Sequence, residues 1–174
     1  RNMELAIKVA KEHKAHVQGT ICYTTSPVHT TEKFAEMAKQ LADLGCDSVC
    51  VKDMAGLIAP ANADELVKAI KSKTKIPLNF HSHCSSGMAP LSHYAAVLAG
   101  ADILDTAFSA FGWGTSHPPT ESMAAAFKGT PYDSCLNLEL LYEIGEYFAT
   151  LSNKYRVLFT AETTRPSINV LLHQ

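Results

Sequence analysis

The sequence predicts an α/β fold made of about four βα units, which is half of a (βα)8 barrel. Strand and helix patterns alternate, and successive strands begin roughly 25 to 30 residues apart, the size of a βα unit. The chemically interesting residues follow strand ends, where barrel active sites lie. No G-x-G-x-x-G follows a strand, which argues against a dinucleotide-binding sheet. A complete barrel needs about 250 residues, more than the 174 of this chain.

The elements are expected in a regular order along one domain. Helix 31–44 has apolar residues three or four apart and ends at Gly45. Pro60 begins the next helix, whose last turn carries lysines, as the helix dipole favours. Asn137 is a good N-cap for the last helix. The expected strands are 17–23, 48–51, 76–80 and 101–104, and the later helices are 88–99 (with Met88, Leu91, Tyr94 and Leu98), 120–128 and 137–151.

Composition narrows the class of protein. A net charge of −2 with only scattered lysines makes nucleic acid and anionic membranes poor partners. The sequence has no apolar stretch long enough to span a membrane and no signal-peptide pattern. Five cysteines without a C-x-x-C pair favour a reducing compartment, so we expect a cytoplasmic protein. Arg1 lies inside a helical pattern and the end at Gln174 has no terminating signal, so we expect a piece of a larger protein.

Two histidines two residues apart give the first functional signal. His81 and His83 stand where the apolar strand 76–80 runs out. Residues at i and i+2 of a strand project from the same face, so both imidazoles can point at one place. Imidazole suits Zn, Fe, Co, Ni and Cu, and carboxylate partners extend the choice to Mn. The alternative is that either ring only makes hydrogen bonds in a loop.

Other polar residues also follow strand ends. Lys52 and Asp53 come after Val-Cys-Val, either as an ion pair on the barrel rim or as part of an active-site mouth. A lysine amine cannot ligate a metal, whereas its carbamate offers two oxygens and a negative charge. Cys22 follows the first strand and can equally be a small buried hydrophobe. The Gly-rich loop 108–119 contains Thr115, and such a loop suits either anion binding or proton transfer by a hydroxyl.

Four segments together resemble the biotin-dependent carboxyltransferases. They are Cys-Tyr-Thr-Thr-Ser-Pro-Val-His-Thr (22–30), Val-Lys-Asp-Met-Ala-Gly-Leu (51–57), His-Ser-His-Cys-Ser-Ser-Gly-Met (81–88) and Gly-Thr-Ser-His-Pro-Pro-Thr-Glu-Ser-Met (114–123). The group includes the oxaloacetate decarboxylase α subunit, the transcarboxylase 5S subunit and the carboxyltransferase part of pyruvate carboxylase. The resemblance runs from about residue 1 to residue 174 in the family's order and spacing.

The resemblance implies a fold and a chemistry. Residues 1–151 would form strands five to eight of the barrel, and 152–174 the truncated start of a segment after it. Lys52, as a carbamate, would join His81 and His83 as ligands of a Zn, Co or Mn ion. Thr115 would carry a proton between biotin and the pyruvate methyl group, and Cys22 would lie near the active site. A carboxyl group would move between oxaloacetate or pyruvate and biotin held on another domain or subunit.

The resemblance also implies partners and missing parts. A homodimer and membrane decarboxylase subunits are possible assemblies of such a protein. The family's aspartate ligand and substrate-binding arginine belong to the first half of the barrel, and the biotinyl domain is separate. We therefore expect the isolated chain to be inactive.

Two other functions are compatible with the His-x-His pair. A metal-dependent acyl-CoA lyase or synthase, of the hydroxymethylglutaryl-CoA lyase or isopropylmalate synthase type, usually has Asp-Thr-x-Gly where this chain has Lys52 to Gly56. Lys52 therefore favours carboxyl transfer. A non-catalytic half barrel that only assembles with partners is the third hypothesis.

Overall fold

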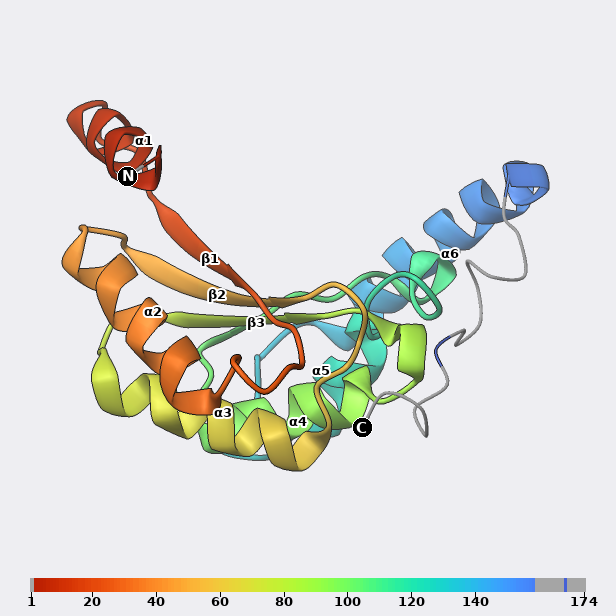
Figure 1. The fold of residues 1–174 in the computed structure, drawn as a ribbon. Coiled ribbons are helices and arrows are strands. Elements are labelled where there is room, and N and C mark those ends of the chain that lie inside the picture. Colours follow the sequence, from red (N-terminus) through yellow and green to blue (C-terminus); the bar gives the residue numbers. More distant parts are fainter. Residues whose placement is uncertain (1, 159–167, 169–174) are drawn as a thin grey trace.

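A four-stranded parallel sheet forms the centre of the structure. The computed structural model describes residues 2–158 and 168 (Figure 1). Strands β1 (Gln18–Cys22), β2 (Ser48–Asp53), β3 (Leu78–Ser82) and β4 (Ile103–Leu104) lie side by side in chain order. Each strand pairs in parallel with the next. This unbroken order is that of consecutive barrel strands, whereas a doubly wound sheet reverses its order.

Helices cover one face of this sheet. They are α2 (Thr31–Asp43), α3 (Pro60–Lys73) and α4 (Ala89–Ala99), and Figure 1 shows them as a layer beneath the strands. Thr30 caps α2 by accepting a hydrogen bond from Lys33 N, and Pro60 begins α3. Gly100, in the left-handed conformation, ends α4.

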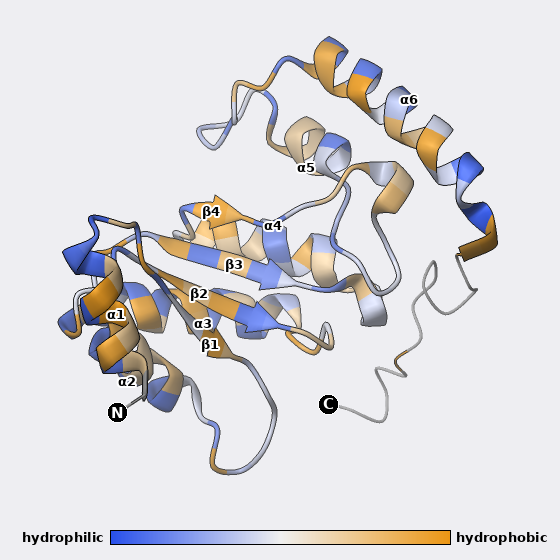
Figure 2. Ribbon diagram, turned by 90° about the horizontal axis from the view of Figure 1, so that it is seen from above, coloured by the Kyte–Doolittle hydropathy of each residue, from blue (hydrophilic) through white to orange (hydrophobic). Residues whose placement is uncertain are grey.

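Alternation along the strands separates a core face from an open face. Ile21, Val51 and Phe80 are at most 1% exposed and pack against the helical layer. The residues between them point to the opposite side, which we call the open face. It includes Thr20, Cys22, Cys50, Lys52, Asn79 and His81. Seen from above, β2 changes from apolar to polar at its arrowhead (Figure 2).

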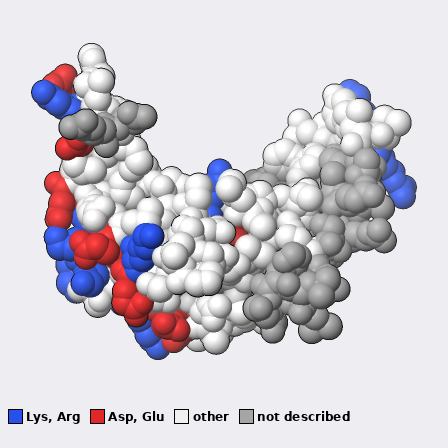
Figure 3. Space-filling model, in the orientation of Figure 1, with Lys and Arg blue, Asp and Glu red and all other residues white. Residues whose placement is uncertain are grey.

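The remaining helices lie at the two ends of the sheet. They are α1 (Asn2–Glu12), α5 (Thr120–Phe127) and α6 (Leu138–Lys154), with one-turn 3-10 helices at Cys84–Ser86, Ser109–Phe111 and Arg156–Leu158. Charged side chains gather over the layer of α2 and α3, and the surface is hollowed between α1 and α6 (Figure 3). Among the described residues, no helix combines the length and apolar character needed to cross a membrane.

Most expected elements are confirmed, with shifted ends. Strand β3 begins and ends two residues later than expected, so His81 lies inside it. Leu91 and Leu98 of α4 are 65% and 50% exposed, because its buried face is formed instead by Ala89, Ser92, His93 and Ala96. The last helix continues to Lys154, across the expected boundary at 151. Of the segment expected at 152–174, residues 159–167 and 169–174 lie outside the described residues.

Asp53 stabilises the turn that follows β2. Its fully buried carboxylate accepts hydrogen bonds from Leu57 N and Ile58 N, both at 2.9 Å, and from Ser82 Oγ at 2.8 Å. Because neighbouring residues point to opposite faces, Asp53 lies away from Lys52. No ion pair joins the two in the part of the chain that the structure describes, so the rim ion pair is the wrong alternative.

We expect Asp53→Ala to lower the free energy of unfolding by about 3 kcal/mol, because Leu57 N, Ile58 N and Ser82 Oγ lose their buried acceptor. Urea unfolding followed by circular dichroism measures the change. Asp43→Ala is the matched control: Asp43 is exposed and forms a surface ion pair with Lys39, so its loss should cost less than about 1 kcal/mol. Equal losses for the two variants would show that Asp53 has no special structural role.

Candidate metal centre

The register of β1, β2 and β3 aligns three residues of the candidate site. Lys52 is the partner of His81 in the β2–β3 pairing and of Cys22 in the β1–β2 pairing. The three residues therefore stand side by side on the open face, at the carboxyl ends of their strands. Lys52 and His81 are partly buried and Cys22 is exposed, so Cys22 is not the buried hydrophobe that was one alternative. No side-chain partner of Lys52 occurs among the described residues.

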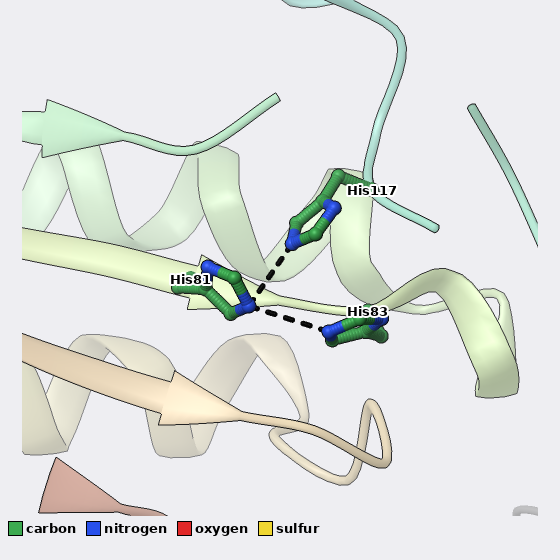
Figure 4. Close-up of side chains that lie close together, drawn as sticks. All are labelled: His81, His83 and His117. Atoms are coloured by element: carbon green, nitrogen blue, oxygen red, sulfur yellow. Dashed lines mark hydrogen bonds between the residues drawn. The ribbon is translucent and has the colours of Figure 1, made fainter. Parts of the chain in front are cut away.

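Three imidazoles converge beside this row. Nε2 of His81 lies 3.3 Å from Nε2 of His83 and 3.0 Å from Nε2 of His117 (Figure 4). One nitrogen from each ring lies within 4.8 Å of the others. The i, i+2 spacing predicts the approach of His81 and His83. His117 comes from the loop before α5, 36 residues after His81.

Two acceptors fix the orientation of the first two rings. His81 Nδ1 donates to Asp105 Oδ2 at 2.7 Å, and His83 Nδ1 donates to the Thr115 carbonyl oxygen at 2.5 Å. Asn79 Nδ2 also donates to Asp105, at 3.1 Å. Metal-binding histidines almost always donate their second ring N–H to a carboxylate or carbonyl, and such partners fix the tautomer.

These hydrogen bonds determine which ring nitrogen carries the proton and which presents a lone pair. Carboxylate and carbonyl oxygens only accept, so Nδ1 carries the proton in His81 and in His83. In the neutral rings both Nε2 atoms then present lone pairs across 3.3 Å. Two acceptors at that distance repel, and a cation between them relieves the repulsion. The residues present therefore fit a divalent metal that accepts imidazole.

Burial shapes the ionisation of the nearby groups. Desolvation, followed by the neighbouring His81 and His83, lowers the pKa of His117 to about 4. Burial raises the pKa of the Cys50 thiol to about 11, with a smaller contribution from Asp105. Burial also raises the pKa of Cys84 to about 11. Both cysteines are thus thiols at neutral pH in the metal-free protein.

The turn after β2 approaches the histidines closely. Gly56 has φ +66°, and a Cβ built on it would lie 2.3 Å from the His83 carbonyl oxygen. His83 N donates to Asp53 O at 3.0 Å, which continues the β2–β3 pairing past the strand end. The backbone of His83 is therefore held from two sides.

The structure brings together most of the residues expected from sequence. Thr115 reaches the cluster through its carbonyl oxygen, and its side chain is exposed. Asp105 and His117 were missed. The position of Asp105 directly after a predicted strand is a signal that could have found it, whereas no spacing rule points to His117. Whether any of these residues binds a metal stays a prediction.

A family model with the description HMGL-like matches residues 1–147, most of the chain. The chain belongs to the HMGL-like family.

Within this family, the chain is similar to carboxylases and carboxyltransferases. The chain is 53% identical over 174 residues to a pyruvate carboxylase subunit of Methanothermobacter thermautotrophicus. It is 42% identical over 158 residues to the methylmalonyl-CoA carboxyltransferase 5S subunit of Propionibacterium freudenreichii. These alignments cover 100% and 90% of this chain but 31% of each relative. The chain therefore spans about a third of the length of these relatives.

Solved structures support the same relationship. The carboxyl transferase domain of Rhizobium etli pyruvate carboxylase matches with a TM-score of 0.86 and 33% identity, over 88% of this chain and 27% of that one. The same domain with 3-hydroxypyruvate gives a TM-score of 0.93 and 31% identity, over 98% and 30%. The predicted family resemblance and the partial barrel are confirmed.

The lowered pKa of His117 predicts a pH dependence of stability in metal-free protein. Between about pH 4 and pH 6.5 the unfolded chain binds a proton at His117 that the folded chain does not. The contribution of neutral His117 to the free energy of unfolding is thus complete above pH 6.5, and it is lost as the pH falls toward 4. Urea unfolding with chelator present should show a flatter pH dependence in His117→Gln. The exposed His13→Gln control should retain the wild-type slope, and an unchanged slope in both variants would refute the prediction.

Proposed function

We propose that this chain forms part of a biotin-dependent carboxyltransferase, which moves a carboxyl group between oxaloacetate or pyruvate and biotin. The observation that carries the proposal is the position of Lys52. It stands in register with His81 on the open face, without a side-chain partner among the described residues. An unpaired lysine beside converging imidazoles suits carbamate formation, which an acyl-CoA lyase or synthase does not use.

In this proposal Lys52, His81 and His83 hold a divalent metal, either Zn, Co or Mn. The Lys52 ammonium loses a proton, the free amine forms an N–C bond to CO₂, and the adduct releases a second proton. The resulting carbamate anion provides the oxygen ligand. The imidazoles contribute their Nε2 lone pairs, which Asp105 and Thr115 orient. When bound, the metal acts as a Lewis acid that polarises a substrate oxygen. The aspartate ligand and substrate-binding arginine come from the rest of the barrel.

The transfer requires a balanced movement of one proton. The carboxyl group leaves a biotin nitrogen and forms a C–C bond at the methyl carbon of pyruvate, and that methyl loses a proton. The Thr115 hydroxyl, exposed next to His83, passes this proton to the biotin nitrogen. In the reverse direction oxaloacetate loses its carboxyl group to biotin. Cys22, beside Lys52, lies within the same row of residues and borders the substrate.

The proposed partners follow from this reaction. Biotin arrives on a carrier domain or subunit, and pyruvate or oxaloacetate binds at the carboxyl ends of the strands. We place the protein in the cytoplasm as a homodimer. In a decarboxylase assembly it joins membrane subunits, whereas in a carboxylase it does not.

Lys52→Ala should abolish biotin-stimulated decarboxylation of oxaloacetate by the full-length protein, together with most of its metal. We expect a loss of more than about 100-fold, since even outer-shell changes cost 10–100-fold. Metal content and pyruvate formation, with free biotin as acceptor, measure both effects. Lys33→Ala, an exposed lysine on α2, is the matched control. If Lys52→Ala keeps its metal and its activity, the carboxyltransferase proposal fails and the acyl-CoA lyase or synthase alternative is favoured.

Thr115→Val should slow proton exchange at the pyruvate methyl group by about 100-fold, within the usual range for a proton-transferring group. Valine keeps the backbone carbonyl that holds His83 and removes only the hydroxyl. Loss of deuterium from labelled pyruvate measures the exchange, and Thr115→Ser should restore most of it. A wild-type exchange rate in the valine variant would show that the Thr115 hydroxyl does not transfer the proton. The role of Thr115 would then be the carbonyl hydrogen bond to His83 alone.

A further inference from the structure

A buried asparagine contacts the carboxylate that orients His81. Asn79 is 4% exposed and precedes His81 by two residues on the open face of β3. Its Nδ2 donates to Asp105 Oδ1 at 3.1 Å, and the other oxygen of that carboxylate accepts from His81 Nδ1 at 2.7 Å. We infer that Asn79 is a positioning residue for His81: it holds Asp105 so that His81 keeps its proton on Nδ1 and presents Nε2 to the metal.

Packing alone does not explain an amide at position 79. Asn79 Oδ1 is buried and has no hydrogen-bond partner among the described residues. An unpaired buried carbonyl oxygen costs stability, and leucine, which has a similar shape, would avoid that cost. The hydrogen bond from Nδ2 is therefore what the amide contributes at this position.

The hydrogen bonds fix both the amide and the carboxylate. A carboxylate only accepts hydrogen bonds, so the NH₂ group of Asn79 faces Asp105 and its oxygen faces away. The two donors, Asn79 and His81, then take one oxygen of Asp105 each. Rotation of the carboxylate would break both hydrogen bonds.

The side chain of Asp105 needs this second contact. The strand β4 has only two residues, and its pairing with β3 ends at Leu104. The backbone of Asp105 is still anchored, since His93 Nε2 lies 3.1 Å from its carbonyl oxygen. The side chain, however, is 41% exposed, so water competes for its oxygens. Asn79 supplies the protein contact that keeps the carboxylate turned toward His81.

The tautomer of His81 decides whether its Nε2 can bind a metal. With the proton on Nδ1, Nε2 presents a lone pair, whereas a proton on Nε2 removes that lone pair. A carboxylate at Nδ1 favours the first form and makes the ring a stronger ligand. Loss of Asn79 frees Asp105 to turn away, and this weakens metal binding without removing a ligand.

A purely structural role for Asn79 is the alternative. The amide would then only join β3 to the segment after β4. Its loss would lower the stability of the protein, and the folded protein would keep its metal affinity. The positioning role predicts the reverse, a lower metal affinity at nearly unchanged stability.

The test replaces Asn79 with leucine in the full-length protein. Asn79→Leu should bind Zn²⁺ about 10-fold more weakly in chelator competition, at the low end of the range for groups outside the ligand set. Its melting temperature should be nearly unchanged, because removal of the unpaired Oδ1 offsets the lost hydrogen bond. Ser92→Ala is the matched control: Ser92 is also buried, but its hydroxyl donates to Ile58 O and Met88 O. This variant should keep wild-type Zn²⁺ affinity.

A second measurement does not require the metal. In metal-free protein labelled with ¹⁵N-histidine, the His81 Nδ1–H signal can be assigned by its loss in His81→Gln. We expect this proton to exchange slowly with water in the unaltered protein and faster in Asn79→Leu.

This inference rests on the proposed metal site, and the two readouts separate their failures. If His81→Gln loses metal while Asn79→Leu keeps wild-type Zn²⁺ affinity, the inference fails and the proposed site stands. Weaker binding with an unchanged Nδ1–H signal also overturns the inference, because the effect then does not pass through His81. If the unaltered protein binds no metal, the proposed site fails, and the Nδ1–H signal alone decides whether Asn79 positions His81.

Discussion

The parallel register of β2 against β3 is the constraint on which the candidate site depends. It sets Lys52 opposite His81, and the hydrogen bond from His83 N to Asp53 O carries the same pairing beyond the strand end. Because side chains alternate along a strand, the neighbours Lys52 and Asp53 have different roles. Lys52 faces the open side, whereas Asp53 turns toward the helices and closes the next turn. A register shift of one residue would exchange the two faces.

The imidazole cluster is held by groups that are not themselves ligands. Asp105 and the Thr115 carbonyl accept hydrogen bonds from the Nδ1–H groups, so the Nε2 lone pairs point inward. Asp105 is in turn placed by its own backbone, since Asp105 N donates to Phe80 O at 3.2 Å. Turning away would cost His81 a charge-assisted hydrogen bond to Asp105 and cost His83 its hydrogen bond to the Thr115 carbonyl. The fold thus positions the Nε2 lone pairs of His81 and His83 in the metal-free protein.

Sequence reasoning predicted the fold and several residues of the candidate site. The i, i+2 rule brought His81 and His83 together and the strand-end rule placed Lys52 nearby, because both rules depend only on local backbone geometry. The role of Lys52 as a ligand rests on the family resemblance and stays a prediction. The same alternation, applied to residues 52 and 53, already excludes an ion pair between them. His117 was beyond such rules. Its approach to His81 depends on how a loop of irregular backbone folds back over β3, and no residue pattern describes that path.

The approach of Gly56 to His83 has a consequence for how this site can vary. A Cβ on Gly56 would push the turn after β2 away from the backbone of His83, which directly follows β3. The close approach of this turn to His83 therefore requires glycine. A methyl group there would act as a wedge between two neighbouring strand ends. The position of His83, a proposed metal ligand, thus depends in part on a residue without a side chain.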